Sequence, residues 1–285
     1  MNVATRRASR MTETDTPIPS YKRPPIIESV WSVQFAEMDW LLPPHTGLFW
    51  SLIREQFPGC EEQAPIAHVI ESEDVFSQPA RRTEIRRVPP LTRQWFVSDS
   101  ETELIQLQRD RFCCNWRRTQ PSDVYPRYGH MKELFESAWT TLTEFIVGMG
   151  QPPLSVDQCE MTYINHMEQG QGWSTISEVG QVFPLMTWQD DLPFLQNPRT
   201  IAAKLAFDLP SLNGRLHASL KHGIRTDEPA ERKEVLILEI TARGLPGDTE
   251  PSGLLQWYAL AREAIVRGFT DLTSPEMHRL WEREQ

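Results

Sequence analysis

Apolar and polar positions alternate with a period of two along residues 26–35. One side of this segment is apolar and the other is polar, which predicts a half-buried strand. Four further short segments with strand character follow, separated by turn residues, and together they predict an antiparallel meander. These segments are residues 82–88, 93–97, 103–108 and 112–117.

Apolar residues recur at helical spacing in two long segments. Residues 131–146 carry a wide apolar stripe, and residues 254–269 carry a second one. Each stripe predicts a long helix that packs on a sheet. A shorter helix is expected over residues 46–57, with Thr46 as its N-cap, and Ser274 followed by Pro275 predicts the start of a last short helix.

The order of elements in the first half of the chain recurs in the second half. Residues 156–167 alternate like a long strand, a short helix follows near residues 176–183, and three strand candidates precede the final helix. The turn Leu212-Asn213-Gly214 is typical of a hairpin. The Gly/Pro-rich segment 148–153 is the expected boundary between the halves.

The pattern therefore predicts an α+β protein made of two successive strand–helix–antiparallel-meander–long-helix halves. The halves span residues 23–150 and 151–285, form one compact unit, and follow a disordered tail at 1–22. A duplicated sheet of the kind found in the TATA-binding-protein fold, with helices on one side, has this order. Such a likeness of fold would not by itself bring DNA binding.

The chain is acidic, which argues against a protein that coats nucleic acid. Its 285 residues carry a formal net charge of −10. The exception is residues 81–132, which contain 11 Lys and Arg residues and 6 Asp and Glu residues and therefore carry a local excess of positive charge. No segment reaches the roughly 18 apolar residues that a membrane-spanning helix needs, and the N-terminus resembles no secretion signal. We expect a cytoplasmic protein.

The four cysteines form no metal or redox motif. Cys113 and Cys114 are adjacent, and neighbours on a strand point to opposite faces. Together with Cys60 and Cys159 they are expected to be ordinary thiols in a reducing compartment. The seven histidines show no ligand spacing, so neither a metal nor a cofactor is expected.

Amide, guanidinium and phenol side chains gather in the last two strands of the expected meander and shortly after them. If residues 109–111 form a tight turn, the flanking strands pair and several of these side chains share or straddle one face of the sheet. Such a face could bind an anion or a peptide backbone, although polar residues on a solvated sheet face are the more ordinary interpretation. The candidate binding residues are Gln106, Gln108, Asn115, Arg117, Arg127 and Tyr128, with Asn165 and His166 on the strand of the second half.

The basic segment offers an alternative site for nucleic acid. Its arginines could meet phosphates, and nearby aromatic residues could stack on bases. Alternation sends Arg86 and Arg87 to opposite faces, which favours instead a solvated face paired with glutamates. The residues of this alternative are Arg81, Arg82, Arg86, Arg87 and Arg93.

Several short patches together are similar to one protein family. They include the runs Leu107-Gln108-Arg109-Asp110-Arg111-Phe112, Asn115-Trp116-Arg117, Tyr125-Pro126-Arg127-Tyr128 and Thr162-Tyr163-Ile164-Asn165. In this combination the chain resembles the sporadically distributed "TIGR" family of uncharacterised bacterial proteins over nearly its whole length. Members often have a His-Glu pair in the last helix, where this chain has Arg262-Glu263. The resemblance implies fold and location, and it brings no activity.

These observations predict a non-enzymatic binding or interaction protein, or an accessory regulator of an antitoxin- or defence-like kind, with a protein partner. A nucleic-acid binder that uses residues 81–132 is one alternative. An enzyme with an unrecognised polar pocket is another, and a pocket that gathers Gln108, Asn115, Arg117, Asn165 and His166 would favour it. An apolar edge strand or an exposed sheet face could also support a homodimer.

Overall fold

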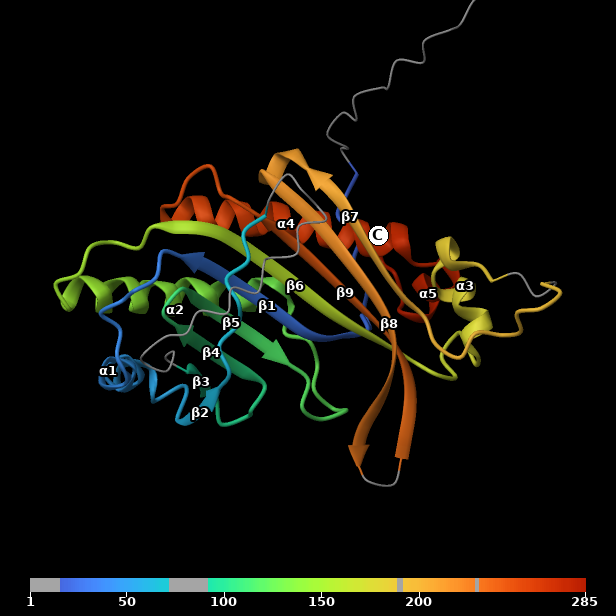
Figure 1. Cartoon of the computed structure of the whole chain (residues 1–285), viewed down its shortest axis with the longest axis horizontal. Coiled ribbons are helices and arrows are strands. Elements are labelled where there is room, and N and C mark those ends of the chain that lie inside the picture. The colour runs from blue at the N-terminus through green and yellow to red at the C-terminus, as the bar shows by residue number, and fades with distance from the viewer. Residues whose placement is uncertain (1–15, 72–91, 189–191, 229–230) are drawn as a thin grey trace, which may run out of the picture.

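The computed structural model of the chain describes residues 16–71, 92–188, 192–228 and 231–285, and these build one antiparallel sheet with helices (Figure 1). The described part has nine strands in the order β2-β3-β4-β5-β1-β6-β9-β8-β7. The strands are β1 (Ile26–Phe35), β2 (Gly59–Gln63), β3 (Arg93–Val97), β4 (Glu103–Gln108), β5 (Arg111–Arg117), β6 (Val156–Glu168), β7 (Ala202–Leu209), β8 (Gly214–Glu228) and β9 (Glu231–Gly244).

Five α-helices accompany the sheet in the described residues. The longest two follow the meanders of the two halves, as the apolar stripes predict. The helices are α1 (Pro43–Ile53), α2 (Arg127–Gly148), α3 (Val179–Val182), α4 (Pro251–Leu272) and α5 (Pro275–Leu280). The mixed α+β class with an antiparallel sheet is confirmed.

The first strands of the two halves form the centre of the sheet. β1 pairs with β6, and each also pairs with the last strand of its own half, which is β5 for β1 and β9 for β6. Trp31 on β1 lies between Cys114 and Met161 in this register. The two halves therefore share one continuous sheet.

The long helices α2 and α4 cover one face of the sheet (Figure 1). The apolar sides of the strands pack against them, and aromatic rings dominate the contact. Trp31 is fully buried and stacks on Tyr258 of α4, with ring centroids 4.6 Å apart, while Phe135 of α2 lies 5.6 Å from Trp31. A single core cluster contains residues from both halves.

Local signals predicted several element boundaries and missed others. Ser274 caps α5 as expected, because its hydroxyl accepts a hydrogen bond from the Met277 amide. The prediction that Thr46 caps α1 is wrong: the helix begins at Pro43, and the Thr46 hydroxyl donates to the Pro43 carbonyl from inside the first turn. The short strand β2 was not predicted, because its sequence is mostly polar and exposed.

The hairpin turn between β7 and β8 is confirmed. Asn213 adopts the left-handed conformation with φ 47°. Gly214 lies directly opposite Gly244, and a Cβ on Gly214 would come within 1.9 Å of the Arg243 carbonyl oxygen. The chain must therefore have glycine there for β8 and β9 to pair closely.

Ordered structure begins upstream of the expected start at residue 23. Tyr21 is buried, and its ring packs edge-on against Phe269 and Trp281. It also forms an antiparallel bridge to Arg283 near the C-terminus. The last part of the segment expected to be a disordered tail is thus packed against α4 and α5. In the residues that the structure describes, no helix is both long and apolar enough to cross a membrane.

Candidate functional site: the polar face of the sheet

The face of the sheet opposite α2 and α4 carries polar side chains across most of its strands. Because strand residues alternate between faces, the same registers that bury aromatic rings on one side place amides and charges on the other. We call this surface the polar face. Its residues include Ser32, Gln34, Gln106, Gln108, Arg111, Asn115, Gln158, Glu160, Arg215, His217 and Arg243.

Many of these polar side chains are buried, because a segment of the same chain lies over them. Residues 64–71, which we call the strap, follow β2 and run across the strands at the centre of the sheet (Figure 1). Gln34 has no exposed surface and Gln158 is 1% exposed. The strap belongs to no strand, so its backbone groups need partners other than a neighbouring strand.

Glutamine carboxamides supply those partners. The Gln108 carboxamide accepts a hydrogen bond from the Ile66 amide and donates one to the Ile66 carbonyl, both at 2.9 Å. The Gln34 carboxamide does the same for the amide and carbonyl of Val69, both at 3.0 Å. A carboxamide has one donor and one acceptor side and so complements both backbone groups of a single residue.

Two further side chains complete this set of backbone contacts. Gln158 donates to the Val69 carbonyl at 2.7 Å and accepts from the Glu71 amide at 2.7 Å. Arg111 donates through Nη2 to the Ala67 carbonyl at 3.2 Å. None of these hydrogen bonds uses a side chain of the strap, so other sequences could make them.

Two side chains of the strap, His68 and Glu71, lie against ionisable side chains from other parts of the chain. His68 lies between two carboxylates, with Nδ1 3.2 Å from Asp110 and Nε2 3.6 Å from Asp157. Glu71 lies among three basic side chains: Arg215 at 2.8 Å, His217 at 2.8 Å and Arg243 at 3.6 Å. We call these the acidic pair and the basic trio.

The basic trio favours the ionised form of Glu71. Burial by itself would raise the pKa of this carboxyl, but hydrogen bonds from His217 and Arg215, together with the charges of His217 and Arg243, lower the pKa below its ordinary value. The carboxylate is therefore charged at neutral pH and anchors the end of the strap.

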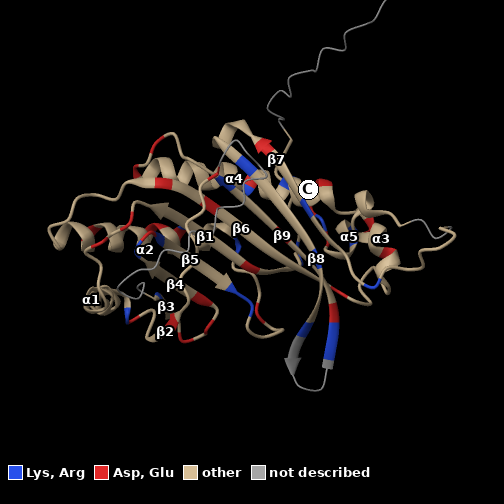
Figure 2. Ribbon diagram, viewed as in Figure 1, with Lys and Arg blue, Asp and Glu red and all other residues tan. Residues whose placement is uncertain are grey.

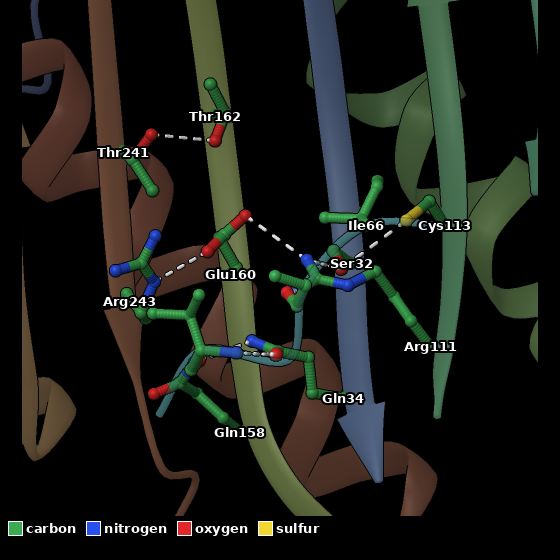
Figure 3. A network of polar contacts seen from close by, with 12 residues as sticks. Ser32, Gln34, Ile66, Arg111, Cys113, Gln158, Glu160, Thr162, Thr241 and Arg243 are labelled. Atoms are coloured by element: carbon green, nitrogen blue, oxygen red, sulfur yellow. Dashed lines mark hydrogen bonds and ion pairs between the residues drawn. The ribbon is translucent and has the colours of Figure 1, made fainter. Parts of the chain in front are cut away.

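A network beneath the strap connects the two halves of the sheet (Figure 3). Arg111 donates to the Ser32 hydroxyl at 3.2 Å and lies 3.6 Å from Glu160. Glu160 also accepts a hydrogen bond of 2.6 Å from Arg243. Glu160 thus compensates the positive charge of both arginines, one of which contacts the strap backbone and the other Glu71.

A second chain of hydrogen bonds crosses the polar face beyond the strap. Arg93 donates to the Gln106 side-chain oxygen Oε1 at 2.6 Å, the Gln106 carboxamide donates to Asn115 at 2.7 Å, and Asn115 donates to Glu28 at 2.8 Å. Burial raises the pKa of Glu28, although the Asn115 hydrogen bond and the nearby Arg117 oppose this rise. Two carboxyl groups of one face, Glu28 and Glu71, therefore have pKa values shifted in opposite directions.

The structure places four of the predicted site residues on the polar face together. Gln106, Gln108, Asn115 and Arg117 share it, as the alternation of β4 and β5 predicts. Of these four, Gln108 contacts the strap. His166 is on the same side of β6 as Glu160, by alternation.

Asn165, Arg127 and Tyr128 lie elsewhere. Asn165 points to the helix-covered side of β6, where its amide donates to the Leu238 carbonyl at 3.1 Å. Arg127 donates to the carbonyls of Tyr21 and Lys22 and so holds the N-terminal segment. Tyr128 packs on the helix side, 5.2 Å from the Trp31 ring. The pocket that would favour an enzyme is therefore not assembled from these residues.

Four of the five arginines of the nucleic-acid alternative are not among the described residues, namely Arg81, Arg82, Arg86 and Arg87. Arg93 is hydrogen-bonded to Gln106, and its guanidinium lies over the Trp95 ring, 5.3 Å from the centroid. Acidic and basic residues are interspersed along the ribbon (Figure 2).

The residues that hold the strap were largely missed from the sequence. Alternation along residues 26–35 puts Gln34 on the polar side of its strand, but no sequence pattern assigns a role to Gln34, Gln158 or Arg111. The only available signal was that Gln34, Gln158 and Arg111 belong to strands whose opposite sides are apolar. The strap itself has no periodicity that predicts its path.

The thiols of Cys113 and Cys114 lie on opposite faces of β5. Cys113 faces Ser32 on the polar face at 3.4 Å, whereas Cys114 belongs to the core cluster, so the two diverge as predicted. Within the described ranges, no group of three His, Cys, Asp or Glu residues could hold a metal ion. Comparison with protein-family models and with curated proteins found no match for the chain.

Proposed function

We propose that this protein is a non-enzymatic binding protein that holds an extended segment of a protein partner on the polar face. In the free protein the strap occupies this site. The protein then acts as an accessory or regulatory factor, which becomes available to its partner when the strap leaves. It requires neither a cofactor nor a metal for this role.

One observation carries the proposal: the carboxamides of three glutamines form hydrogen bonds with the backbone of the strap. Gln34, Gln108 and Gln158 together contact both backbone groups of Ile66 and Val69 and the amide of Glu71. Recognition through main-chain hydrogen bonds is how proteins bind extended peptides with limited regard to sequence. A solvated sheet face would not need paired carboxamides that are almost completely buried.

The strap is also weakly anchored by apolar contacts. Ile66 is 36% exposed and Ile70 is 49% exposed, so the strap buries little apolar surface. Polar contacts can be replaced by equivalent contacts from another segment, whereas loss of a buried apolar anchor has no such compensation. The strap is therefore a replaceable occupant of the face.

The shared sheet supports a related proposal about the origin of the fold. Each half contributes one central strand, a meander that pairs back to it, and a long helix. A duplicated sheet-and-helix unit of the TATA-binding-protein kind accounts for this order, with β2 as an addition of the first half. The junction of two such halves at β1 and β6 is where the polar face is assembled.

The proposal is tested by supplying the strap as a separate peptide. In one variant, residues 64–71 are replaced by eight Gly and Ser residues, and a fluorescein-labelled, amidated peptide of residues 64–71 is titrated while anisotropy is measured. The variant should bind the peptide, and the wild-type protein should bind it at least tenfold more weakly, because its own strap competes at a high effective concentration.

The matched control adds Gln34→Ala and Gln158→Ala to the strap-replaced variant. These substitutions remove acceptors and donors for the peptide backbone, so binding should be lost while near-UV circular dichroism still reports a folded core. The proposal fails if the strap-replaced variant is folded and shows no binding of the peptide at high micromolar concentration.

A further inference from the structure

The polar face contacts two side chains of the strap as well as its backbone. The acidic pair contacts His68, and the basic trio contacts Glu71. These charged groups come from different strands and loops, and they lie along the path that the carboxamides define. The face is therefore positive at the Glu71 end of the strap and negative near its middle.

We infer that the polar face selects partner segments with a histidine or another basic residue followed, three positions later, by an acidic residue. This inference rests on the proposed function and names the class of segment that the site takes. The partner is an extended stretch of another protein whose charges replace those of His68 and Glu71.

The spacing follows from the backbone contacts on either side of His68, and on its N-terminal side Gln108 contacts both backbone groups of Ile66. Gln34 and Gln158 both contact Val69, and Gln158 also holds the amide of Glu71. These contacts set the register in which position 68 lies between Asp110 and Asp157. A partner that keeps the same backbone contacts must carry its charges at the same two positions.

The two charge positions differ in strength. Glu71 accepts hydrogen bonds of 2.8 Å from both Arg215 and His217, and its side chain is 15% exposed. His68 is 32% exposed, and one of its two carboxylate contacts is long. Charge-assisted hydrogen bonds in a partly buried site are worth more than exposed ion pairs. The acidic position should therefore dominate selection.

The test compares peptides of equal composition on the strap-replaced variant. The first peptide has the native sequence of residues 64–71, and the second exchanges the two charged positions, with His68→Glu and Glu71→His. Both have the same length, net charge and hydropathy. The native peptide should bind about 10- to 100-fold more tightly, because the exchanged one places a carboxylate against the acidic pair and leaves the basic trio without a carboxylate.

A double-mutant cycle assigns the effect to the basic trio. Glu71→Gln in the peptide should weaken binding about tenfold to the strap-replaced variant. The same change in the peptide should have a smaller effect when the protein also carries Arg215→Gln. In that protein the interaction between Arg215 and Glu71 is already absent, so the peptide substitution cannot remove it.

The outcomes separate this inference from the proposed function. Equal affinities for the native and exchanged peptides would overturn the charge selection and leave backbone binding intact. Absence of binding by both peptides would overturn the proposed function and, with it, the inference. Dimers of the wild-type protein that disappear in the strap-replaced variant would overturn the inference by showing that the occupant is the strap of a second copy.

A second measurement needs only point substitutions in the full chain. Glu71→Arg brings a positive charge to the basic trio, so the strap should leave the face and the Val69 amide should exchange with deuterium at least tenfold faster. The matched control is Glu62→Arg on the exposed strand β2, which removes the same charge and should leave this exchange rate unchanged. Equal rates in the two variants would contradict the role of Glu71.

Discussion

The two faces of the sheet are covered in different ways. On one face, α2 and α4 bury aromatic rings such as Trp31, and the contact is apolar and continuous. On the other face, the strap is held by carboxamides and charges, while its own isoleucines remain half exposed. The first cover is part of the folded core, whereas the second is held mainly by polar contacts.

The difference indicates where the molecule can exchange contacts. Apolar burial contributes about 25 cal/mol for each Å² removed from water, and it has no substitute when a helix leaves. The net contribution of a hydrogen bond to stability is about 1 kcal/mol, and its donor and acceptor can bond to water or to another chain instead. We expect stability to depend on the helix face and binding to depend on the polar face.

The largest effect is expected from the helix face. Trp31→Ala should lower the free energy of unfolding by about 3–5 kcal/mol, because it leaves a cavity among Tyr128, Phe135 and Tyr258. Urea denaturation followed by circular dichroism measures the loss. The exposed Val124→Ala is the control and should change stability by less than about 0.5 kcal/mol. Similar values for the two would remove the distinction between the faces.

A smaller effect is expected from a backbone contact of the strap. Gln34→Ala removes both hydrogen bonds to Val69 and should cost about 1–2 kcal/mol in urea denaturation. Hydrogen exchange of the Val69 amide should accelerate, while amides in the centre of β1 keep their protection. Faster exchange throughout β1 would show that the polar face is part of the same cooperative unit as the core.

The carboxyl of Glu71 should make attachment of the strap dependent on pH. Its pKa is lowered in the folded protein, so its contribution is complete above the unfolded value and is lost as the pH falls through the folded value. Glu71→Gln should remove about 1–2 kcal/mol at neutral pH and have little effect in acid. Exchange of the Val69 amide over pH 3–7 measures this, and an equal effect of the substitution at all pH values would contradict it.

The carboxyl of Glu28 should act in the opposite direction. Its pKa is raised in the folded protein, so its contribution is complete below the unfolded value and is lost as the pH rises through the folded value. Glu28→Gln keeps an acceptor for Asn115 and should stabilise the protein at pH 8 by less than about 1 kcal/mol. Urea denaturation at pH 4 and pH 8 checks the sign, and destabilisation at pH 8 would show that the charged form is the favoured one.

Much of the sheet could be predicted because alternation is a local property. β1, β3 and β4 lie where the pattern placed them. β8 and β9 are longer than the strands that the pattern indicates over residues 214–222 and 234–242. The strap could not be predicted in the same way. Its residues contact side chains that lie from 35 to 172 positions away along the chain.

The candidate site was predicted in part for the same reason. Gln108, Gln106, Asn115 and Arg117 share a face because they alternate on two strands joined by a tight turn. Asn165 was grouped with them only by its polar side chain, and its position on β6 directs it to the helix-covered face. The residue type indicates which chemistry a side chain can perform. Alternation along the strand decides which face of the sheet that side chain lies on.

The sequence by itself determined which side of each strand is apolar, where the long helices lie, and that two halves follow one another. These properties depend on neighbours within a few residues. Only the tertiary structure decided that β1 and β6 meet at the centre of the sheet, that Gln34 and Gln158 thereby lie side by side, and that Glu71 reaches three basic residues from β8 and β9. The register between strands distant in sequence, which no local pattern encodes, created the polar face.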